Sequence, residues 1–276
     1  MLKSIYIWEL LGGFALSTLI GVLGYKQEAL DWSGVLGAMA TGTVIFGLGG
    51  WEWGALLIAF FISSSALSFY RGNEKRVLAE KFSKGHRRDV GQALANAGTA
   101  AAVAILSVFR PDPLWYAACI GAMAAVNADT WATELGVLSE RLPRLITTWR
   151  PVDVGTSGGV TLLGTLASLG GALFIALVAG LSLLLSGTRL TSAGSFLLAG
   201  TLGGLVGGLA DSFMGATVQA IYWCDTCAKE TERQIHGCGA ETRQVRGWRW
   251  LGNDWVNFVA SVVGGLVAAG FIWLLG

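Results

Sequence analysis

The sequence predicts an all-α fold, a polytopic bundle of transmembrane helices. Hydrophobic residues make up 53% of the 276 positions and charged residues only 13%, with a mean hydropathy of +0.59. Soluble domains carry roughly 25% charged residues. The 40 glycines suit helices that pack closely within a bilayer. A net charge of +1 gives no indication of nucleic-acid binding. We expect one integral-membrane domain over residues 1–276, without a cleavable signal peptide.

Eight apolar segments are near the roughly 20 residues that a helix needs to cross a bilayer. Because Glu9 lies within the first segment and Asp31 opens the second, a bundle of seven spans is the alternative. The predicted spans cover residues 4–24, 30–49, 51–70, 91–109, 114–138, 158–186, 194–222 and 252–275.

The distribution of the basic residues favours eight spans over seven. Sixteen of the 19 Lys and Arg residues fall in the loops 25–29, 71–90, 139–157 and 223–251. Eight spans place these four loops on one side of the membrane. The positive-inside rule makes that side the cytosol and leaves both termini outside.

The loop 71–90 predicts a short amphipathic helix followed by a basic turn. It has two interpretations. Its charges can orient the chain and contact anionic lipids. Alternatively, Lys84, His86, Arg87 or Arg88 captures a phosphate at the mouth of a site.

The stretch 121–136 begins as a membrane segment and ends with two carboxylates, Asp129 and Glu134. A charge inside a bilayer is costly, so such residues are by default functional. Five residues correspond to about 140° around a helix, so the two side chains do not share a face. Either the helix is interrupted here or two faces are used. Carboxylates held by polar neighbours only for packing are the alternative.

Two further acids, Asp211 and Asp254, fall in the inner half of their spans or at its inner end. The span of Asp211 carries Gly204, Gly208 and Ser212 at every fourth position, which predicts a close neighbouring helix. Mg²⁺ prefers carboxylate oxygens together with the phosphates of a substrate. We therefore predict that Asp129, Glu134, Asp211 and Asp254 form a catalytic magnesium site near the cytosolic face.

Residues 151–161 form a Gly-rich stretch that leads into the sixth span. A turn that opens a helix offers backbone N–H groups to an anion. It is not a P-loop, because no Gly-Lys-Ser/Thr follows at the required spacing. An ordinary capped helix start is the alternative. The predicted phosphate and nucleotide ligands are Asp153, Gly155, Thr156, Ser157, Gly158 and Gly159, with Asn253 and Asn257 from the eighth span.

The last cytosolic loop contains Cys224, Cys227, His236 and Cys238. A Cys-x-x-Cys pair with two more thiol or imidazole ligands suits a structural Zn²⁺ site. Free thiols and a disulfide are the alternatives, the disulfide being disfavoured in a reducing cytosol.

Four ordered blocks of the sequence resemble the signatures of one integral-membrane family, which includes the plant and cyanobacterial phytyl-phosphate kinase. The blocks are residues 128–136, 154–161, 211–216 and 253–257. The resemblance implies transfer of a phosphoryl group, with CTP as the expected donor, to an isoprenoid monophosphate in phytol salvage for tocopherol or quinone synthesis. It lends no support to zinc, because the Cys and His residues lie outside the family pattern.

Two other functions are consistent with acidic residues inside the spans. A CTP-dependent cytidylyltransferase would make a CDP-lipid and release pyrophosphate. An ion-coupled transporter also carries acids within its spans. The acids here fall at one depth instead of lining a path across the membrane, which favours an enzyme.

Overall fold

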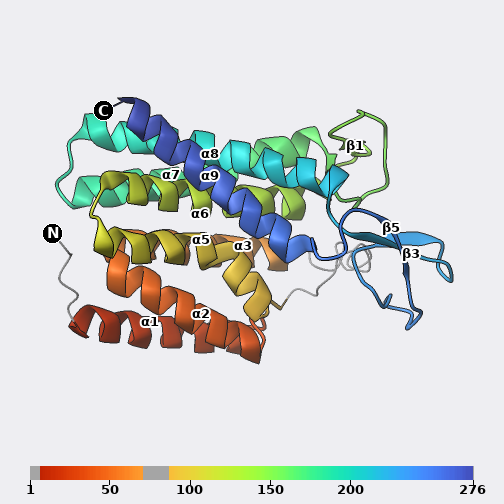
Figure 1. The fold of residues 1–276 in the computed structure, drawn as a ribbon, viewed down its shortest axis with the longest axis horizontal. Helices are drawn as coiled ribbons and strands as arrows, with labels where there is room; N and C mark the ends of the chain where they lie inside the picture. Colours follow the sequence, from red (N-terminus) through yellow and green to blue (C-terminus); the bar gives the residue numbers. More distant parts are fainter. Residues whose placement is uncertain (1–6, 71–86, 276) are drawn as a thin grey trace.

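The structure, a computed structural model, describes residues 7–70 and 87–275. Within these ranges the chain forms a bundle of eight long helices that run roughly side by side (Figure 1). In chain order they are α1 (Ile7–Lys26), α2 (Trp32–Val44), which continues into the π-helix η1 (Ile45–Gly49), α3 (Trp51–Phe69), α5 (Val90–Phe109), α6 (Pro113–Gly136), α7 (Leu162–Leu185), α8 (Leu190–Thr217) and α9 (Asn253–Leu275). The predicted class, a polytopic helical membrane protein, is confirmed.

Seven of these helices are long and apolar enough to cross a membrane, and α6 is the eighth long helix. α6 differs because it lies at the centre of the bundle, packed against α3, α5, α7, α8 and α9. Its residues Tyr116–Ala128 are buried without interruption. A helix enclosed by protein needs no lipid-compatible face, so it accommodates polar side chains that an outer helix would expose to lipid.

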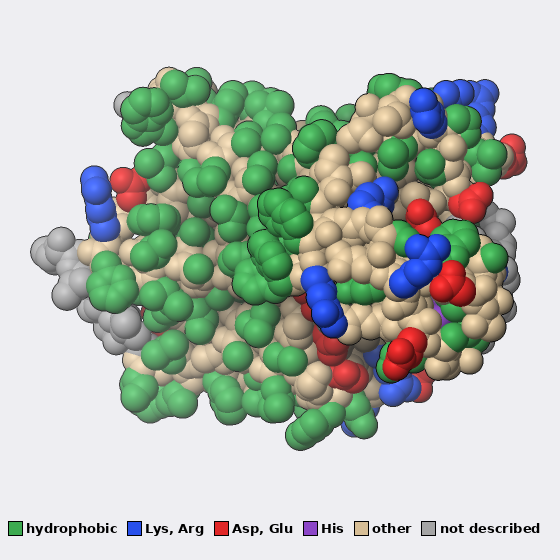
Figure 2. All heavy atoms as spheres, turned by 45° about the vertical axis from the view of Figure 1, so that its right-hand side comes forward, with side chains coloured by type: hydrophobic (Ala, Val, Ile, Leu, Met, Phe, Trp, Pro, Cys, Tyr) green, Lys and Arg blue, Asp and Glu red, His purple; other side chains and the backbone are tan. Residues whose placement is uncertain are grey.

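The two ends of the bundle differ in character. Figure 1 shows the C-terminus at one end, with the start of α1, and the strands at the opposite end. Most charged side chains on the face in Figure 2 lie over the strand-bearing end, whereas the flank of the bundle is largely hydrophobic. On α7 this apolar surface is a stripe of exposed leucines, from Leu162 through Leu166 and Leu177 to Leu181. This pattern is typical of a bundle that crosses a bilayer along its long axis.

The strand-bearing end holds two small sheets. The strands β1 (Arg144–Leu145) and β2 (Gly159–Val160) pair antiparallel in the loop between α6 and α7. Between α8 and α9, β3 (Ile221–Cys224) is the central strand of an antiparallel sheet with β4 (Lys229–Thr231) and β5 (Arg243–Arg246). The predicted spans 158–186 and 194–222 were therefore too long, because the chain forms β2 before α7 and begins β3 soon after α8.

Small residues let the central helices approach closely. A methyl group added at Gly204 would lie 2.7 Å from the Cβ atoms of Ala124 on α6 and Ala172 on α7. A methyl group at Gly207 would lie 2.4 Å from Cβ of Ala125 and 2.9 Å from the carbonyl oxygen of Ala260 on α9. Gly204, which belongs to the predicted repeat, thus faces close neighbours as predicted, and Gly207, outside that repeat, brings α9 close on a second side.

A matched pair of variants tests this packing. Gly204→Leu inserts a side chain where no space exists, so we expect the free energy of unfolding to fall by about 1–3 kcal/mol. Gly194→Leu lies on the same helix, and a Cβ there would meet nothing within 4 Å. Thermal unfolding of both purified variants measures the difference. Equal melting temperatures would contradict the close packing of α6, α7 and α8.

Candidate functional site

A pair of carboxyl groups joins the two central helices. Asp129 on α6 and Asp211 on α8 lie close enough for their carboxyl groups to share a hydrogen bond. Oδ2 of Asp211 is buried and finds no hydrogen-bond partner among the described residues. Two carboxyl groups at this separation cannot both carry a charge unless a cation or a proton lies between them. The pair could therefore hold either a shared proton or a divalent cation.

Helix geometry brings Asp254 to a similar depth. Near Gly207, the helices α6, α8 and α9 touch at Ala125 and Ala260. From this level Asp129 and Asp211 are each four residues further along parallel helices, a rise of about 6 Å. Asp254 precedes Ala260 by six residues on the antiparallel helix α9, or about 9 Å in the same direction. All three acids therefore lie toward the strand-bearing end.

The Gly-rich turn lies against the end of α8. Gly158 has φ of +81°, and a Cβ there would come 2.4 Å from the backbone nitrogen of Ala216. Glycine is thus required at this position both by its backbone conformation and by its contact. The contact places the turn one to two helical turns from Asp211.

The turn does not open α7 directly, contrary to the sequence-based expectation. α7 begins at Leu162, and its N-cap is Thr161, whose hydroxyl accepts a hydrogen bond from the backbone N–H of Gly164. Strand β2 separates the turn from this cap. Within the turn, the N–H of Thr156 donates to the carbonyl of Asp153 and that of Gly159 to the carbonyl of Thr156. These two amides are therefore engaged locally.

Glu232, which directly follows β4, completes the acidic cluster. Its Oε1 accepts hydrogen bonds of 2.8 Å from the hydroxyl of Ser157 and from the side-chain amide of Gln219. The carboxylate is also near enough to Asp129 and Asp211 to interact with both electrostatically. Glu232 thus links the Gly-rich turn to the carboxyl pair.

A cation accompanies these acids. Nη2 of Arg246, at the end of β5, donates to the carbonyl of Gly215 at 3.0 Å and to that of Ser157 at 3.4 Å. Its Nε is buried without a hydrogen-bond partner in the part of the chain that the structure describes. Arg246 therefore brings a positive charge between α8 and the Gly-rich turn.

Glu134 faces the other side of α6. Its Oε1 accepts a hydrogen bond of 2.7 Å from the hydroxyl of Ser68 on α3. Arg88, just before α5, is near enough to attract it electrostatically. Because α6 is continuous through Gly136, the two carboxylates use two faces of one helix, and the structure places Glu134 with Arg88 instead of in contact with Asp211.

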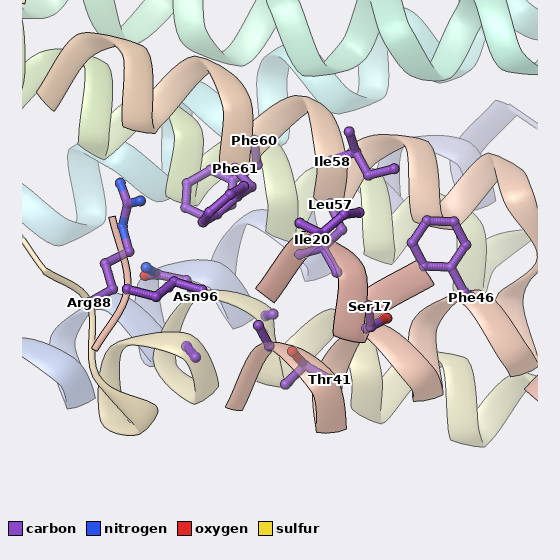
Figure 3. A pocket seen from close by; sticks show the side chains of 15 residues that line it. Ser17, Ile20, Thr41, Phe46, Leu57, Ile58, Phe60, Phe61, Arg88 and Asn96 are labelled. Atoms are coloured by element: carbon purple, nitrogen blue, oxygen red, sulfur yellow. The ribbon is translucent and has the colours of Figure 1, made fainter. Parts of the chain in front are cut away.

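An apolar cavity begins at Arg88 and runs between α1, α2, α3 and α5 (Figure 3). The space between its lining side chains, including the part open to the surroundings, is about 620 Å³. Figure 3 shows Arg88 at one end and Phe46 toward the other, with Asn96 between them. The Arg88 guanidinium also lies 5.8 Å from the ring centroid of Phe60 and donates to Ser65. The cavity thus combines an apolar wall with one cation at its strand-side end. Its other lining residues are Ser17, Ile20, Leu30, Ala38, Thr41, Gly42, Leu57, Ile58, Phe61, Ala93 and Ala97.

The remaining predicted ligands have varied positions. Asn253 begins α9 and Asn257 follows one turn later, both partly buried. Their role in orienting a ligand stays a prediction. Arg87 pairs with Glu28, and the predicted phosphate ligands Lys84 and His86 lie outside the described residues.

The predicted zinc ligands converge in the sheet beyond α8. The ligand atoms of Cys224, Cys227, His236 and Cys238 all lie within 4.8 Å of one another. A backbone hydrogen bond at Ala240, and then the His236 ring, lower the pKa of the Cys238 thiol to about 6. A hydrogen bond with Cys238 raises the pKa of Cys227 to about 11. The four side chains are thus close enough to change one another's ionisation, and the Cys238 thiol ionises most readily of the two whose pKa is shifted.

Fold and site define a class of protein: a multi-pass helical membrane protein with an acidic site at one end of its bundle. The comparison with family models is specific. The sequence model of the integral membrane protein DUF92 family matches residues 15–265, so the chain belongs to this family. The resemblance carried by the four sequence blocks is thereby confirmed.

Relatives from distant organisms share most of the chain. Protein PGR of Arabidopsis thaliana is 33% identical, over 93% of this chain and 93% of its own length. An uncharacterized membrane protein of Methanocaldococcus jannaschii is 33% identical over 88% and 85% of the two chains. Protein VTE6, chloroplastic, of Arabidopsis thaliana is 24% identical over 91% of this chain and 68% of its own. No solved structure matches the chain.

Proposed function

We propose that the protein is a membrane-embedded kinase that transfers a phosphoryl group from a nucleoside triphosphate, with CTP expected, to an isoprenoid monophosphate such as phytyl phosphate. The observation that carries the proposal is the arrangement of two sites around α6. The Asp129–Asp211 pair lies on one face of this helix, and Glu134 with Arg88 and the apolar cavity lies on another. Membership of a family that includes phytyl-phosphate kinase supports it.

The donor nucleotide would bind at the carboxyl pair. Asp129, Asp211 and Asp254 are suited to hold Mg²⁺, directly or through water, and Mg²⁺ would neutralise phosphate charge in the transition state. The Gly-rich turn and Arg246 lie beside these acids and would contact the phosphates. Glu232 positions the turn through Ser157.

The acceptor would bind at the cavity. An isoprenoid chain is apolar and would lie against the apolar side chains between α1, α2, α3 and α5, while its phosphate would pair with the guanidinium of Arg88. Glu134 would orient Arg88 instead of binding the magnesium ion, which revises the sequence-based assignment of all four acids to one metal site.

The chemistry needs positioning more than a strong base. A phosphate oxygen of the acceptor forms a bond to the γ-phosphorus while the bond from that phosphorus to the β–γ bridging oxygen breaks. The products are a nucleoside diphosphate and an isoprenoid diphosphate. Because the acceptor oxygen is already anionic, no side chain must remove a proton. The concentration of basic residues in the loops at this end supports a site on the cytosolic side.

Labelled CTP distinguishes the proposed reaction from its rivals. In inside-out vesicles with Mg²⁺ and phytyl phosphate, label from the γ-phosphate should enter the lipid. A cytidylyltransferase would instead transfer label from the α-phosphate and release pyrophosphate, and a transporter would transfer neither.

Asp129→Asn or Asp211→Asn should lower turnover by about a hundredfold or more, equivalent to about 2.7 kcal/mol.

The control for these variants is Glu52→Gln at the opposite end of the bundle, where Glu52 accepts a hydrogen bond from Ser186. It removes one charge far from the proposed site and should leave turnover unchanged. If Asp129→Asn and Asp211→Asn, folded and monodisperse, retained full turnover and the same Mg²⁺ dependence, the proposed donor site would be refuted.

The acceptor site has its own test. Arg88→Gln should raise KM for phytyl phosphate by about tenfold, while KM for CTP stays the same, because only the lipid phosphate would lose its cation. Arg87→Gln changes the neighbouring, exposed arginine and serves as the control. Equal rises in both KM values, or no rise for Arg88→Gln, would place the acceptor elsewhere.

A further inference from the structure

Two tight turns bring four metal-binding side chains together in the sheet beyond α8. The first contains Cys224 and Cys227 and joins β3 to β4. The second contains His236 and Cys238 and is closed by hydrogen bonds between His236 and Ala240 and between Gly239 and His236, each 2.9 Å. The two turns lie next to each other although eight residues separate Cys227 from His236.

Both turns contain a residue with positive φ at the same position. The residue after the second ligand of each pair has positive φ, +51° at Ala228 and +84° at Gly239. Alanine seldom adopts this conformation, so local contacts must hold Ala228 there. Such a reversal turns both ligands of a pair toward one point.

The distances suit a tetrahedral metal. Zn²⁺ binds thiolate sulfur at about 2.3 Å, so two sulfurs on a tetrahedral centre lie about 3.8 Å apart. The Sγ atoms of Cys224 and Cys238 are 3.8 Å apart. Nδ1 of His236 is 3.2 Å from Sγ of Cys238, and all four ligand atoms lie within 4.8 Å of one another.

We propose that Cys224, Cys227, His236 and Cys238 bind one structural zinc ion. Four protein ligands close the coordination sphere, so the ion would stabilise the loop and perform no reaction. The loop between α8 and α9 needs another source of stability, because about 30 residues with three strands of three or four residues cannot form a hydrophobic core of their own. A disulfide would use only two of the three thiols and would leave the third thiol and the histidine without a role.

The zinc site has a consequence for the acidic cluster. Glu232 lies between the two ligand pairs in sequence, five residues after Cys227 and four before His236. Fixing both pairs would therefore fix Glu232 against Ser157 and Gln219, whose hydrogen bonds it accepts. This consequence rests on the proposed function, whereas the metal site does not.

Metal analysis tests the site without any assay of activity. Full-length protein purified with a tag that contains no histidine, and without added metal, should contain about one zinc per chain. Cys224→Ser and Cys227→Ser should each lower this to about a tenth or less, whereas Cys119→Ser, which changes a buried thiol within α6, should not. Protein from cells grown with Co²⁺ should show the intense visible absorption of tetrahedral cobalt bound to thiolates.

The cobalt spectrum needs only the wild-type chain, so it remains decisive if the serine variants fail to fold. A wild-type chain that contains less than about a tenth of a zinc ion, shows no cobalt spectrum and has three freely titrating loop thiols would overturn the proposal. A chain that contains zinc but transfers no phosphoryl group would retain this site and refute the proposed function alone.

Discussion

The carboxyl pair of Asp129 and Asp211 is the constraint on which the rest of the structure depends. The two carboxyl groups lie close enough to share a hydrogen bond between the central helices, Glu232 is near both, and all three acids are partly buried. Like charges in such a place are unfavourable unless a cation or a proton offsets them. A shared proton offsets this repulsion when the pair is hydrogen-bonded, and a divalent ion could take the place of that proton. Phosphoryl transfer needs such an ion at a fixed place.

Close helix packing holds this pair in position. Glycine and alanine at the contacts of α6, α8 and α9 leave no room for larger side chains, so the helices cannot slide apart to separate the carboxyl groups without losing their packing. α6 provides polar groups in two directions because protein surrounds it, which allows Asp129 and Glu134 to serve different sites. The small sheet then covers the strand-bearing end, and from it Glu232 and Arg246 reach the Gly-rich turn.

Local patterns predicted the helices and several of the acids, but not their partners. Apolar length and charge asymmetry gave the number of helices, and helical periodicity showed that Asp129 and Glu134 cannot share a face. Glu232 and Arg246 were missed as site residues because they lie in a loop far along the chain from Asp129, and only tertiary contacts bring them near. Strands of two to four residues are too short for an alternating pattern to reveal. The cavity at Arg88 is formed by four helices and has no local signature. The convergence of Cys224, Cys227, His236 and Cys238 was predictable because their spacing is itself a local signal.

The most direct test of the central claim locates the cation itself. In a structure of the protein with Mn²⁺ and a non-hydrolysable CTP analogue, anomalous scattering identifies the metal. The account predicts a manganese ion that binds one oxygen of Asp129 and one of Asp211 at about 2.1 Å, with the nucleotide phosphates beside the Gly-rich turn. A nucleotide and metal bound elsewhere, with the two carboxyl groups still sharing their own hydrogen bond, would contradict it.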